Sequence, residues 1–152
     1  MMNSLNKTGR KILYNCVWPA FQYSHKINPN YPAVAKTCNV YRNHDDVFDS
    51  WNSISSIIDF YGDHNQEFIK YNGPGNWFDP DMVVIGNFGL SYHQSRAQMA
   101  MWAMWSSPLF MSNDLREIMP EMKEILQNGK VIEVNQDSMG KMGTRVLKVS
   151  LS

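Results

Sequence analysis

Residues 38–51, with the sequence CNVYRNHDDVFDSW, decide how this chain is expected to fold. Residues 38–42 contain the β-branched and aromatic side chains that are typical of a strand. Asp49 and Ser50 are of the types that cap helices, and the apolar side chains that follow share one helical face: Trp51, Ile54, Ile57, Ile58 and Tyr61. We therefore predict a strand that passes through a short polar loop into a helix, which ends at Gly62.

The alternation of strand and helix continues on both sides of this unit. Further strands are predicted at residues 12–18, 81–85, 107–112 and 131–134, and further helices at residues 32–37, 92–105 and about 113–126. Ser91 is placed to cap the second of these helices. Residues 22–30 are predicted to form a loop, and residues 72–76 a tight turn. This alternation is typical of βαβ units in a parallel sheet.

Two α/β architectures fit about four such units. An open, doubly wound sheet is one, but no glycine-rich phosphate loop follows any predicted strand, which argues against a nucleotide-binding domain. The other is a closed (β/α)8 TIM barrel, which typically needs about 250 residues, so that 152 residues would form roughly half of it. Barrel enzymes carry their catalytic residues at the carboxyl ends of the strands. Carboxylates with aromatic neighbours follow predicted strands at residues 42–51 and recur at residues 77–82, and they indicate sugar chemistry.

The composition argues against several classes of partner. Apolar residues make up 43% of the chain, charged residues 18%, and the formal net charge is zero, so nothing favours nucleic acid or an acidic membrane surface. No run of about 18 apolar residues indicates a membrane span, and residues 1–11 lack the apolar core of a signal peptide. The four histidines show no metal-ligand spacing, and no cofactor is predicted.

Two features bear on the compartment. Asn6 begins the glycosylation sequon Asn6-Lys7-Thr8. Cys16 and Cys38 are far enough apart in the sequence to close a loop, but they could equally be two buried thiols. These cues alone leave a secreted or lysosomal setting and a reducing one equally open.

Five motifs together carry a resemblance to a known family: NCVWP at residues 15–19, YRN at 41–43 with DSW at 49–51, GPG at 73–75, DPDMVVIGNFGLS at 79–91, and PLFMSNDLR at 108–116. They resemble the α-galactosidase and α-N-acetylgalactosaminidase family, glycoside hydrolase family 27, from about residue 4 to about residue 143. The resemblance implies a (β/α)8 barrel followed by a small antiparallel β domain. Residues 1–143 would then be the C-terminal half of the barrel, strands five to eight, and residues 144–152 the start of the β domain or a truncated tail.

The activity implied by the resemblance is hydrolysis of terminal α-linked galactose or N-acetylgalactosamine, in glycolipids, glycoproteins or oligosaccharides, with retention at the anomeric carbon. Such enzymes need one carboxyl group as nucleophile and another as acid/base. The family's acid/base position falls on Asp46, with Asp45 as the competitor and a pair of solvated loop charges as the alternative. Arg42 matches the residue that contacts the substituent at the sugar's 2-position, although a structural ion pair is the other interpretation.

Further site residues follow from the resemblance. Asp81 and Met82 match positions at the rim and floor of the sugar site, whereas Asp79 is expected to brace the turn. The family pairs cysteines at the positions of Cys16 and Cys38 in a disulfide, which would fix the loop of residues 17–21 and favours an oxidising compartment.

The preferred sugar is expected to depend on residues 17–21. Ala20 leaves room for an acetyl group, and Val17 can touch its methyl but cannot hydrogen-bond to a 2-hydroxyl, so N-acetylgalactosamine is slightly favoured. Phe21 stands where the family usually has a tyrosine, and Phe78 where an asparagine commonly precedes Asp79. Because Val17, Phe21 and Phe78 each remove a polar group, a non-catalytic sugar-binding remnant of the same fold is the alternative.

The family's nucleophile lies in a short motif on strand four, with a lysine before the aspartate, and this motif does not occur in the chain. A retaining mechanism cannot complete its first displacement without a nucleophile. We therefore expect a fragment or truncated product with no activity of its own. The resemblance implies a lysosomal or secreted parent enzyme and allows a homodimeric one.

Overall fold

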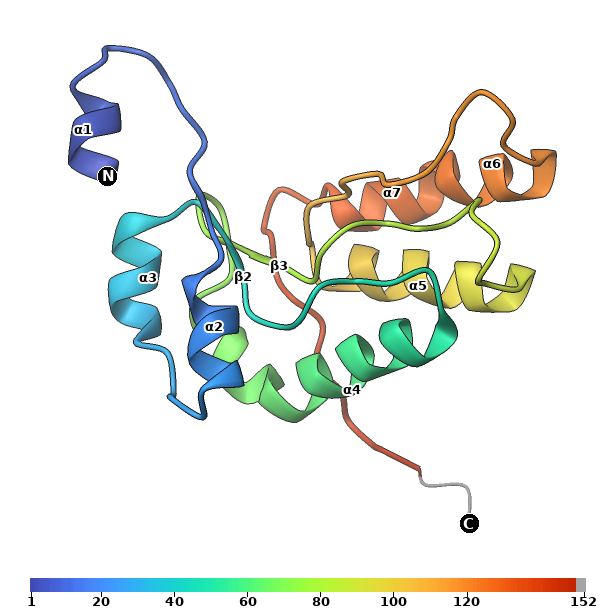
Figure 1. The fold of residues 1–152 in the computed structure, drawn as a ribbon, viewed down its shortest axis with the longest axis horizontal. Helices are drawn as coiled ribbons and strands as arrows, with labels where there is room; N and C mark the ends of the chain where they lie inside the picture. The colour runs from blue at the N-terminus through green and yellow to red at the C-terminus, as the bar shows by residue number, and fades with distance from the viewer. Residues whose placement is uncertain (150–152) are drawn as a thin grey trace.

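The computed structural model describes residues 1–149, which are built around a three-stranded parallel sheet (Figure 1). Its strands are β1 (Asn15–Cys16), β2 (Val40–Arg42) and β3 (Trp77–Asp79), in the spatial order β1-β2-β3. The register pairs Cys16 with Tyr41, Tyr41 with Phe78, and Arg42 with Asp79. Because the strands are parallel, their carboxyl ends meet at one edge of the sheet.

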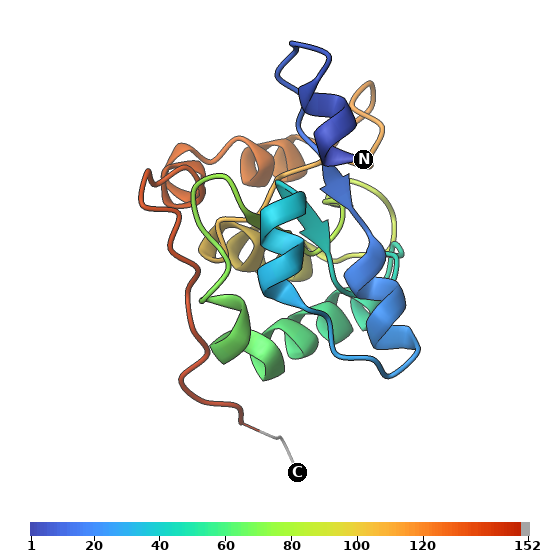
Figure 2. The ribbon, with the colours of Figure 1, turned by 90° about the vertical axis from the view of Figure 1, so that its left-hand side faces the viewer.

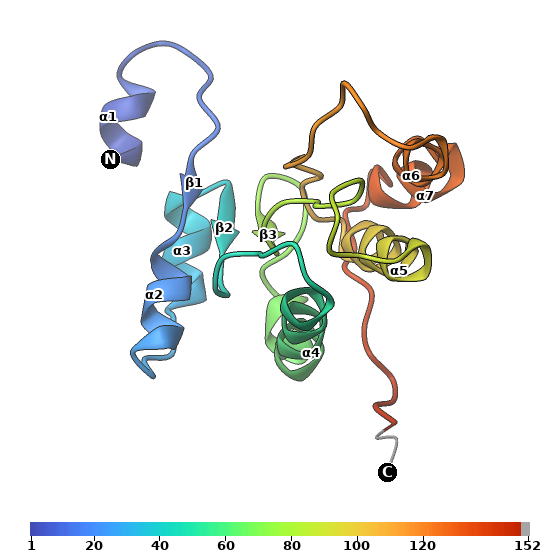
Figure 3. The same ribbon diagram turned by 45° about the vertical axis from the view of Figure 1, so that its right-hand side comes forward.

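Helices follow each strand. The helices α2 (Trp18–Ser24) and α3 (Tyr31–Thr37) connect β1 to β2, and α4 (Trp51–Phe68) connects β2 to β3. After β3 come α5 (Tyr92–Met104), α6 (Pro120–Leu126) and α7 (Gly129–Asn135). Figure 3 shows α2 and α3 on one side of the strands and α5 to α7 on the other, with α4 beneath. The short helix α1 (Met2–Asn6) stands apart from the rest (Figure 2).

Local capping explains where the two longest helices begin. Ser50 accepts a hydrogen bond from the backbone N–H of Ser53 at the start of α4, as predicted. Ser91 and Gln94 form a reciprocal capping box at the start of α5. The helix α4 does not end at Gly62, so that prediction is wrong: it continues to Phe68, because Asn65 and Phe68 are buried against the core.

Several other predicted elements need correction. Residues 18–24 are helical rather than strand and loop, since a proline at residue 19 is tolerated in the first helical turn. Residues 131–134 lie in α7, which Asn128 caps; a short apolar run cannot by itself distinguish strand from helix. The strands expected at 81–85 and 107–112 are reduced to one isolated parallel bridge between Val83 and Met111, and β3 lies at 77–79 instead. The helix predicted from about residue 113 begins only at Pro120.

An aromatic core joins the sheet to α4 and α5. Phe78 of β3 stacks on Phe68 of α4 with ring centroids 4.4 Å apart, and Tyr41 of β2 meets Phe78 edge-on at 4.7 Å. Trp105, at the end of α5, stacks on Tyr61 of α4 at 4.4 Å. These contacts fix α4 and α5 relative to the strands, and so fix the loops that leave the strand ends.

Residues 141–149 contain no helix or strand and run past α4 and α5. The backbone N–H of Gly143 donates to the carbonyl of Met104 at 2.7 Å, and Asn65 donates its side-chain N–H to the carbonyl of Gly143 at 2.9 Å. The Arg145 guanidinium then lies over Gly62, where a side chain on the helix would overlap it. The domain boundary expected after residue 143 stays a prediction.

Candidate active site

Arg42, the last residue of β2, is the centre of a cluster of charges at the carboxyl edge of the sheet. Its guanidinium lies 3.2 Å from the carboxylate of Asp81 and also pairs with the carboxylate of Asp46. Burial alone would lower the pKa of Arg42, but the hydrogen bond to Asp46 and the charge of Asp81 raise it above its ordinary value. The cluster therefore holds a permanent cation between two carboxylates.

Asp81 connects this cation to the neighbouring loops. Its carboxylate accepts hydrogen bonds from the backbone N–H groups of Val47, at 2.8 Å, and Met82, at 2.9 Å. Its backbone adopts a positive φ of 77°, and its carbonyl accepts a hydrogen bond of 2.8 Å from the indole N–H of Trp102. Asp81 thus fixes the loop that carries Asp46 to the turn after β3.

The two adjacent loop carboxylates differ in their surroundings. The Asp46 side chain is 77% exposed, so one face of its carboxylate contacts Arg42 while the rest is open to solvent. Asp45 is also exposed. Within residues 1–149 its carboxylate makes no hydrogen bond and no ion pair. Asp46, which the sequence selected over Asp45, is therefore the one that Arg42 orients.

Asp79, the last residue of β3, is only 2% exposed. One of its carboxylate oxygens accepts from the side-chain N–H of Asn15 at 3.2 Å, and the other accepts from the backbone N–H of Asp81 at 2.9 Å. Burial raises the pKa of Asp79 above its ordinary value. Asp79 therefore links β1 to the turn at Asp81 rather than facing solvent.

The predicted specificity residues lie at the start of α2. Val17 immediately follows β1 and is 37% exposed, Ala20 is buried, and Phe21 projects outward with 65% exposure. By the register of the strands, Val17 leaves the sheet at the same edge as Arg42. Met82 is half-buried beside Asp81. The strand register therefore places Val17 beside Arg42, and Ala20 and Phe21 follow in α2.

Cys16 and Cys38 form the predicted disulfide, with their Cα atoms 6.0 Å apart, and both residues are buried. The bond joins Cys16, at the end of β1 and just before Val17, to Cys38, which lies two residues before β2. Asn6, the predicted glycosylation site, is exposed at the end of α1, away from the cluster.

Phe78 corrects one expectation. Its side chain is fully buried among Tyr31, Tyr41 and Phe68, and so it points into the core rather than into the site.

Gln98 is a residue that the sequence reasoning missed. It is fully buried on α5, where its side chain accepts a hydrogen bond from the backbone N–H of Val84 and donates one to the carbonyl of Met82, both at 3.2 Å. Its spacing of four positions from Trp102 was the available signal, because both face the turn after β3.

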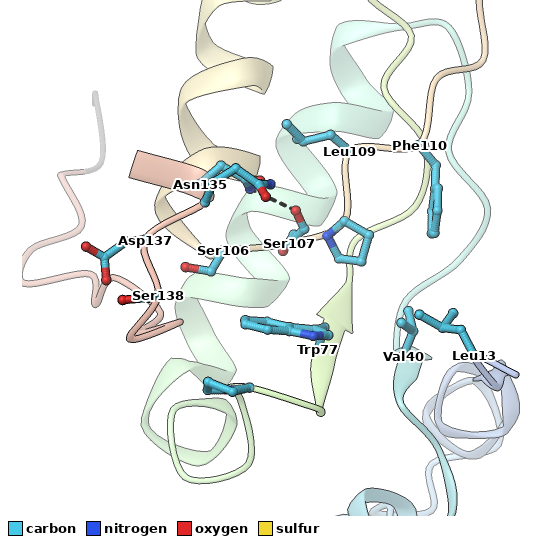
Figure 4. A pocket seen from close by; sticks show the side chains of 13 residues that line it. Leu13, Val40, Trp77, Ser106, Ser107, Leu109, Phe110, Asn135, Asp137 and Ser138 are labelled. Carbon is cyan, nitrogen blue, oxygen red and sulfur yellow. Dashed lines mark hydrogen bonds between the residues drawn. The ribbon is translucent and has the colours of Figure 1, made fainter. Parts of the chain in front are cut away.

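A cavity of about 470 Å³ lies at the opposite edge of the sheet (Figure 4). Among its lining residues, Leu13 precedes β1, Val40 begins β2 and Trp77 begins β3, so the cavity lies at the amino ends of the strands. In barrel folds this end relates to stability and the other end to catalysis. A second hollow of about 380 Å³, lined by His44, Asp46 and the start of α4, adjoins the charged cluster instead.

Among residues 1–149, no group of three or more histidine, cysteine, aspartate or glutamate side chains is arranged to hold a metal ion. Over the same part of the chain, no helix has the length and apolar character needed to cross a bilayer.

A helix-covered parallel sheet with charged residues gathered at the carboxyl ends of its strands is the arrangement of α/β-barrel enzymes. The model of the alpha galactosidase A family matches residues 1–137. The chain therefore belongs to the alpha galactosidase A family, as its motifs predicted.

Individual relatives agree with this assignment. The chain is 49% identical to alpha-N-acetylgalactosaminidase of Gallus gallus over 148 residues, which are 97% of this chain and 36% of that protein. It is 50% identical to alpha-galactosidase A of Homo sapiens over 143 residues, 94% of this chain and 33% of that protein. The chain thus spans about a third of the length of these relatives.

Solved structures show the same fold. Alpha-galactosidase I from Mortierella vinacea superposes with a TM-score of 0.83 at 29% identity, covering 98% of this chain and 40% of that one. The alpha-galactosidase of Saccharomyces cerevisiae with raffinose superposes with a TM-score of 0.80 at 25% identity, covering all of this chain and 36% of that one. The α/β fold is therefore that of these enzymes over part of their length.

Proposed function

We propose that this chain forms the acid/base half of a retaining exo-glycosidase that removes terminal α-linked galactose or N-acetylgalactosamine. In this assignment the chain supplies strands five to eight of a (β/α)8 barrel, and Asp46 is the general acid/base. The contact of the Arg42 guanidinium with both Asp46 and Asp81, at the carboxyl edge of a parallel sheet, is the observation that carries the proposal.

Each carboxylate of the cluster has a role that its surroundings support. Asp46 is open to solvent on one side, so its protonated form can donate to a glycosidic oxygen and its carboxylate can then activate water. Asp81 accepts two backbone hydrogen bonds and pairs with Arg42, which suits a rim residue held in place to contact the sugar. Arg42, already fixed by both, would contact the substituent at the 2-position.

Asp81 and Asp79 are poor candidates for the nucleophile. Both oxygens of Asp79 accept hydrogen bonds in a buried position, and both oxygens of Asp81 accept from backbone N–H groups. We infer that the nucleophile, about 5–5.5 Å from Asp46 in a retaining enzyme, belongs to polypeptide outside these 152 residues. The chain alone is then expected to be inactive.

The residues at the start of α2 would set the preferred sugar. The small side chain of Ala20 would leave room for an acetyl group, and exposed Val17 offers methyl groups without a hydrogen-bonding group. This combination favours N-acetylgalactosamine over galactose. We further propose that Met82 lines the floor of the site, that Asn6 is glycosylated, and that the parent enzyme is secreted or lysosomal and can be a homodimer.

A hybrid enzyme provides the test. Replacing the matching third of the chicken alpha-N-acetylgalactosaminidase with this chain supplies the missing part of the barrel. The hybrid is expected to hydrolyse a nitrophenyl α-N-acetylgalactosaminide, and Asp46→Asn is expected to lower kcat by about 10²–10⁴-fold. Asp45→Asn, which changes the adjacent exposed carboxylate, is the matched control and is expected to retain activity. If both variants are equally active, Asp46 is not the acid/base.

A non-catalytic sugar-binding remnant is the second candidate. Val17 and Phe21 favour it, because both side chains are exposed and apolar where a sugar-binding enzyme would need polar contacts. The buried position of Phe78 removes one of the three reasons for this alternative. A hybrid that binds galactose or N-acetylgalactosamine in a calorimetric titration without turnover would favour the remnant.

A further inference from the structure

His44 lies in the loop after β2, two residues before Asp46, and is half-buried. Its imidazole lies flat on the ring of Phe60 in α4, with centroids 4.5 Å apart and planes within 1° of parallel. The Nε2 atom of His44 is 3.1 Å from the hydroxyl oxygen of Ser56, one turn earlier in α4. The face and the edge of the imidazole are therefore both held by the same helix.

A second imidazole contacts the same phenyl ring. His64 packs on Phe60 with centroids 4.2 Å apart, and its Nδ1 lies 2.8 Å from the backbone carbonyl of Phe60, to which it donates. Tyr23 of α2 meets both Phe60 and His64 edge-on, at 5.0 and 5.1 Å. The cluster of His44, Phe60, His64 and Tyr23 thus joins the loop after β2 to α4 and α2.

The backbone of His44 is also connected to Asp46. The Nη2 atom of Arg42 donates to the carbonyl of His44 at 3.5 Å, and the same atom pairs with the carboxylate of Asp46. One guanidinium nitrogen of Arg42 therefore contacts both the backbone of His44 and the carboxylate of Asp46.

We propose that His44 is a positioning residue: its neutral imidazole holds the loop that carries Asp46 against α4, and protonation releases that loop. The acid/base role of Asp46 rests on the proposed function, whereas the pH response of the loop that carries Asp46 does not. In the neutral ring that carries its proton on Nδ1, Nε2 accepts from the Ser56 hydroxyl. Protonation turns Nε2 into a donor, so this hydrogen bond must reverse, and a positive charge must be placed in a half-buried position.

The charged and titratable groups around His44 have opposing effects. Burial lowers the pKa of His44, and the charges of His64 on α4 and Arg42 on β2 act in the same direction, while Asp45 on the loop raises it. From α2, Tyr23 contacts Phe60 and His64 rather than His44 itself. The net direction is downward, so the unfolded chain binds this proton more readily than the folded chain. The contact made by the neutral His44 imidazole is complete above about pH 6.5, the ordinary pKa of histidine. It is lost as the pH falls through the lower pKa that His44 has in the folded chain.

The test is a titration of the complete chain, with isotope-labelled histidine and backbone amides, followed by NMR from about pH 8 to about pH 4. The amide signals of Asp45 and Asp46 are expected to shift with the same midpoint as the His44 ring. In His44→Phe, which can still stack on Phe60 but cannot titrate, this transition disappears from both amides. In His64→Gln, which removes an imidazole whose charge lowers the pKa of His44, the midpoint rises.

His93→Phe is the control, because His93 is exposed at the start of α5, and it is expected to leave the loop response unchanged. The proposal is overturned if the His44 ring titrates without a matching shift of the two amides, or if the shift persists with the same midpoint in His44→Phe. Neither result depends on turnover. A failure of the Asp46→Asn test in the hybrid enzyme would overturn the proposed function and leave this pH response intact.

Discussion

Replacing Asp81 with alanine tests whether one carboxylate holds the candidate site together. The Asp81 side chain is 12% exposed, pairs with Arg42 at 3.2 Å and accepts from the N–H groups of Val47 and Met82. A hydrogen bond to a charged group contributes about 1.5–3 kcal/mol. Alanine also tolerates the positive φ of this position poorly, at a cost of about 1–2 kcal/mol. Two such hydrogen bonds and the backbone cost together come to about 4–8 kcal/mol. Because contributions from one carboxylate are not additive and Arg42 keeps Asp46 as a partner, we expect Asp81→Ala to lower the free energy of unfolding by about 4 kcal/mol, the lower end of this range.

Urea unfolding followed by tryptophan fluorescence measures this loss. Asp81→Asn separates the two causes, because asparagine tolerates positive φ and keeps one acceptor while losing the charge, so it should lose about half as much. Hydrogen exchange of the Val47 amide should accelerate in both variants. Asp114→Ala breaks an exposed ion pair with Arg116 and is the control, expected to change little. If Asp81→Ala is no less stable than Asp114→Ala, Asp81 does not hold the site.

Three further predictions concern the fold around the site. Gly89→Ala should cost about 1–3 kcal/mol in urea unfolding, because a Cβ there would overlap the backbone carbonyl of Asp49, which cannot move aside. Reducing the Cys16–Cys38 disulfide, which joins residues 22 positions apart, should cost about 3 kcal/mol, measured with and without reductant. Burial raises the pKa of Asp79, so the folded chain binds its proton more tightly; the free energy of unfolding should fall as the pH rises from the ordinary value of about 3.9 through the folded pKa.

Each of these has a contrasting outcome. Gly129→Ala places a Cβ in open space and should be neutral, so equal losses at both glycines would contradict the steric argument. Identical stability of the oxidised and reduced chains would mean that the disulfide does not constrain the unfolded state. Asp79→Asn should abolish the fall in the free energy of unfolding as the pH rises through this range, and an unchanged pH dependence in this variant would exclude Asp79 as its source.

The parts of the fold that follow from local chemistry were predictable from the sequence. Ser50 and Ser91 cap helices because their hydroxyls satisfy free N–H groups wherever the chain turns, and no long-range information is needed. The motif resemblance gave the pairing of Cys16 with Cys38, which spacing alone could not establish.

The failures have a common physical origin in tertiary packing. Val131 and Ile132 form too short an apolar run to reveal its period, and only the capping by Asn128 and the contact with the core make it helical. The helix α4 passes through Gly62 because distant residues bury its last turns, and the Arg145 guanidinium occupies the space that the glycine leaves.

In the candidate site too, some residues were predictable from sequence motifs and others depend on tertiary packing. Arg42, Asp46 and Asp81 were selected by motif, and the sheet register brings them together. The ring of His44 could not be placed from sequence, since its contact with Phe60 depends on how the loop folds back on α4. Phe78 was wrongly predicted to face the sugar site because it precedes Asp79. Successive side chains of β3 point to opposite faces of the sheet, so the position of Asp79 does not decide where Phe78 points.

A crystal structure of the hybrid enzyme with galactose bound tests the central assignment most directly, through one distance. We expect a carboxyl oxygen of Asp46 within hydrogen-bond reach, about 2.6–3.2 Å, of the anomeric hydroxyl of the sugar, with Arg42 and Asp81 lining the same site. A sugar bound elsewhere, or one whose anomeric hydroxyl faces Asp45 while Asp46 points into solvent, would contradict it.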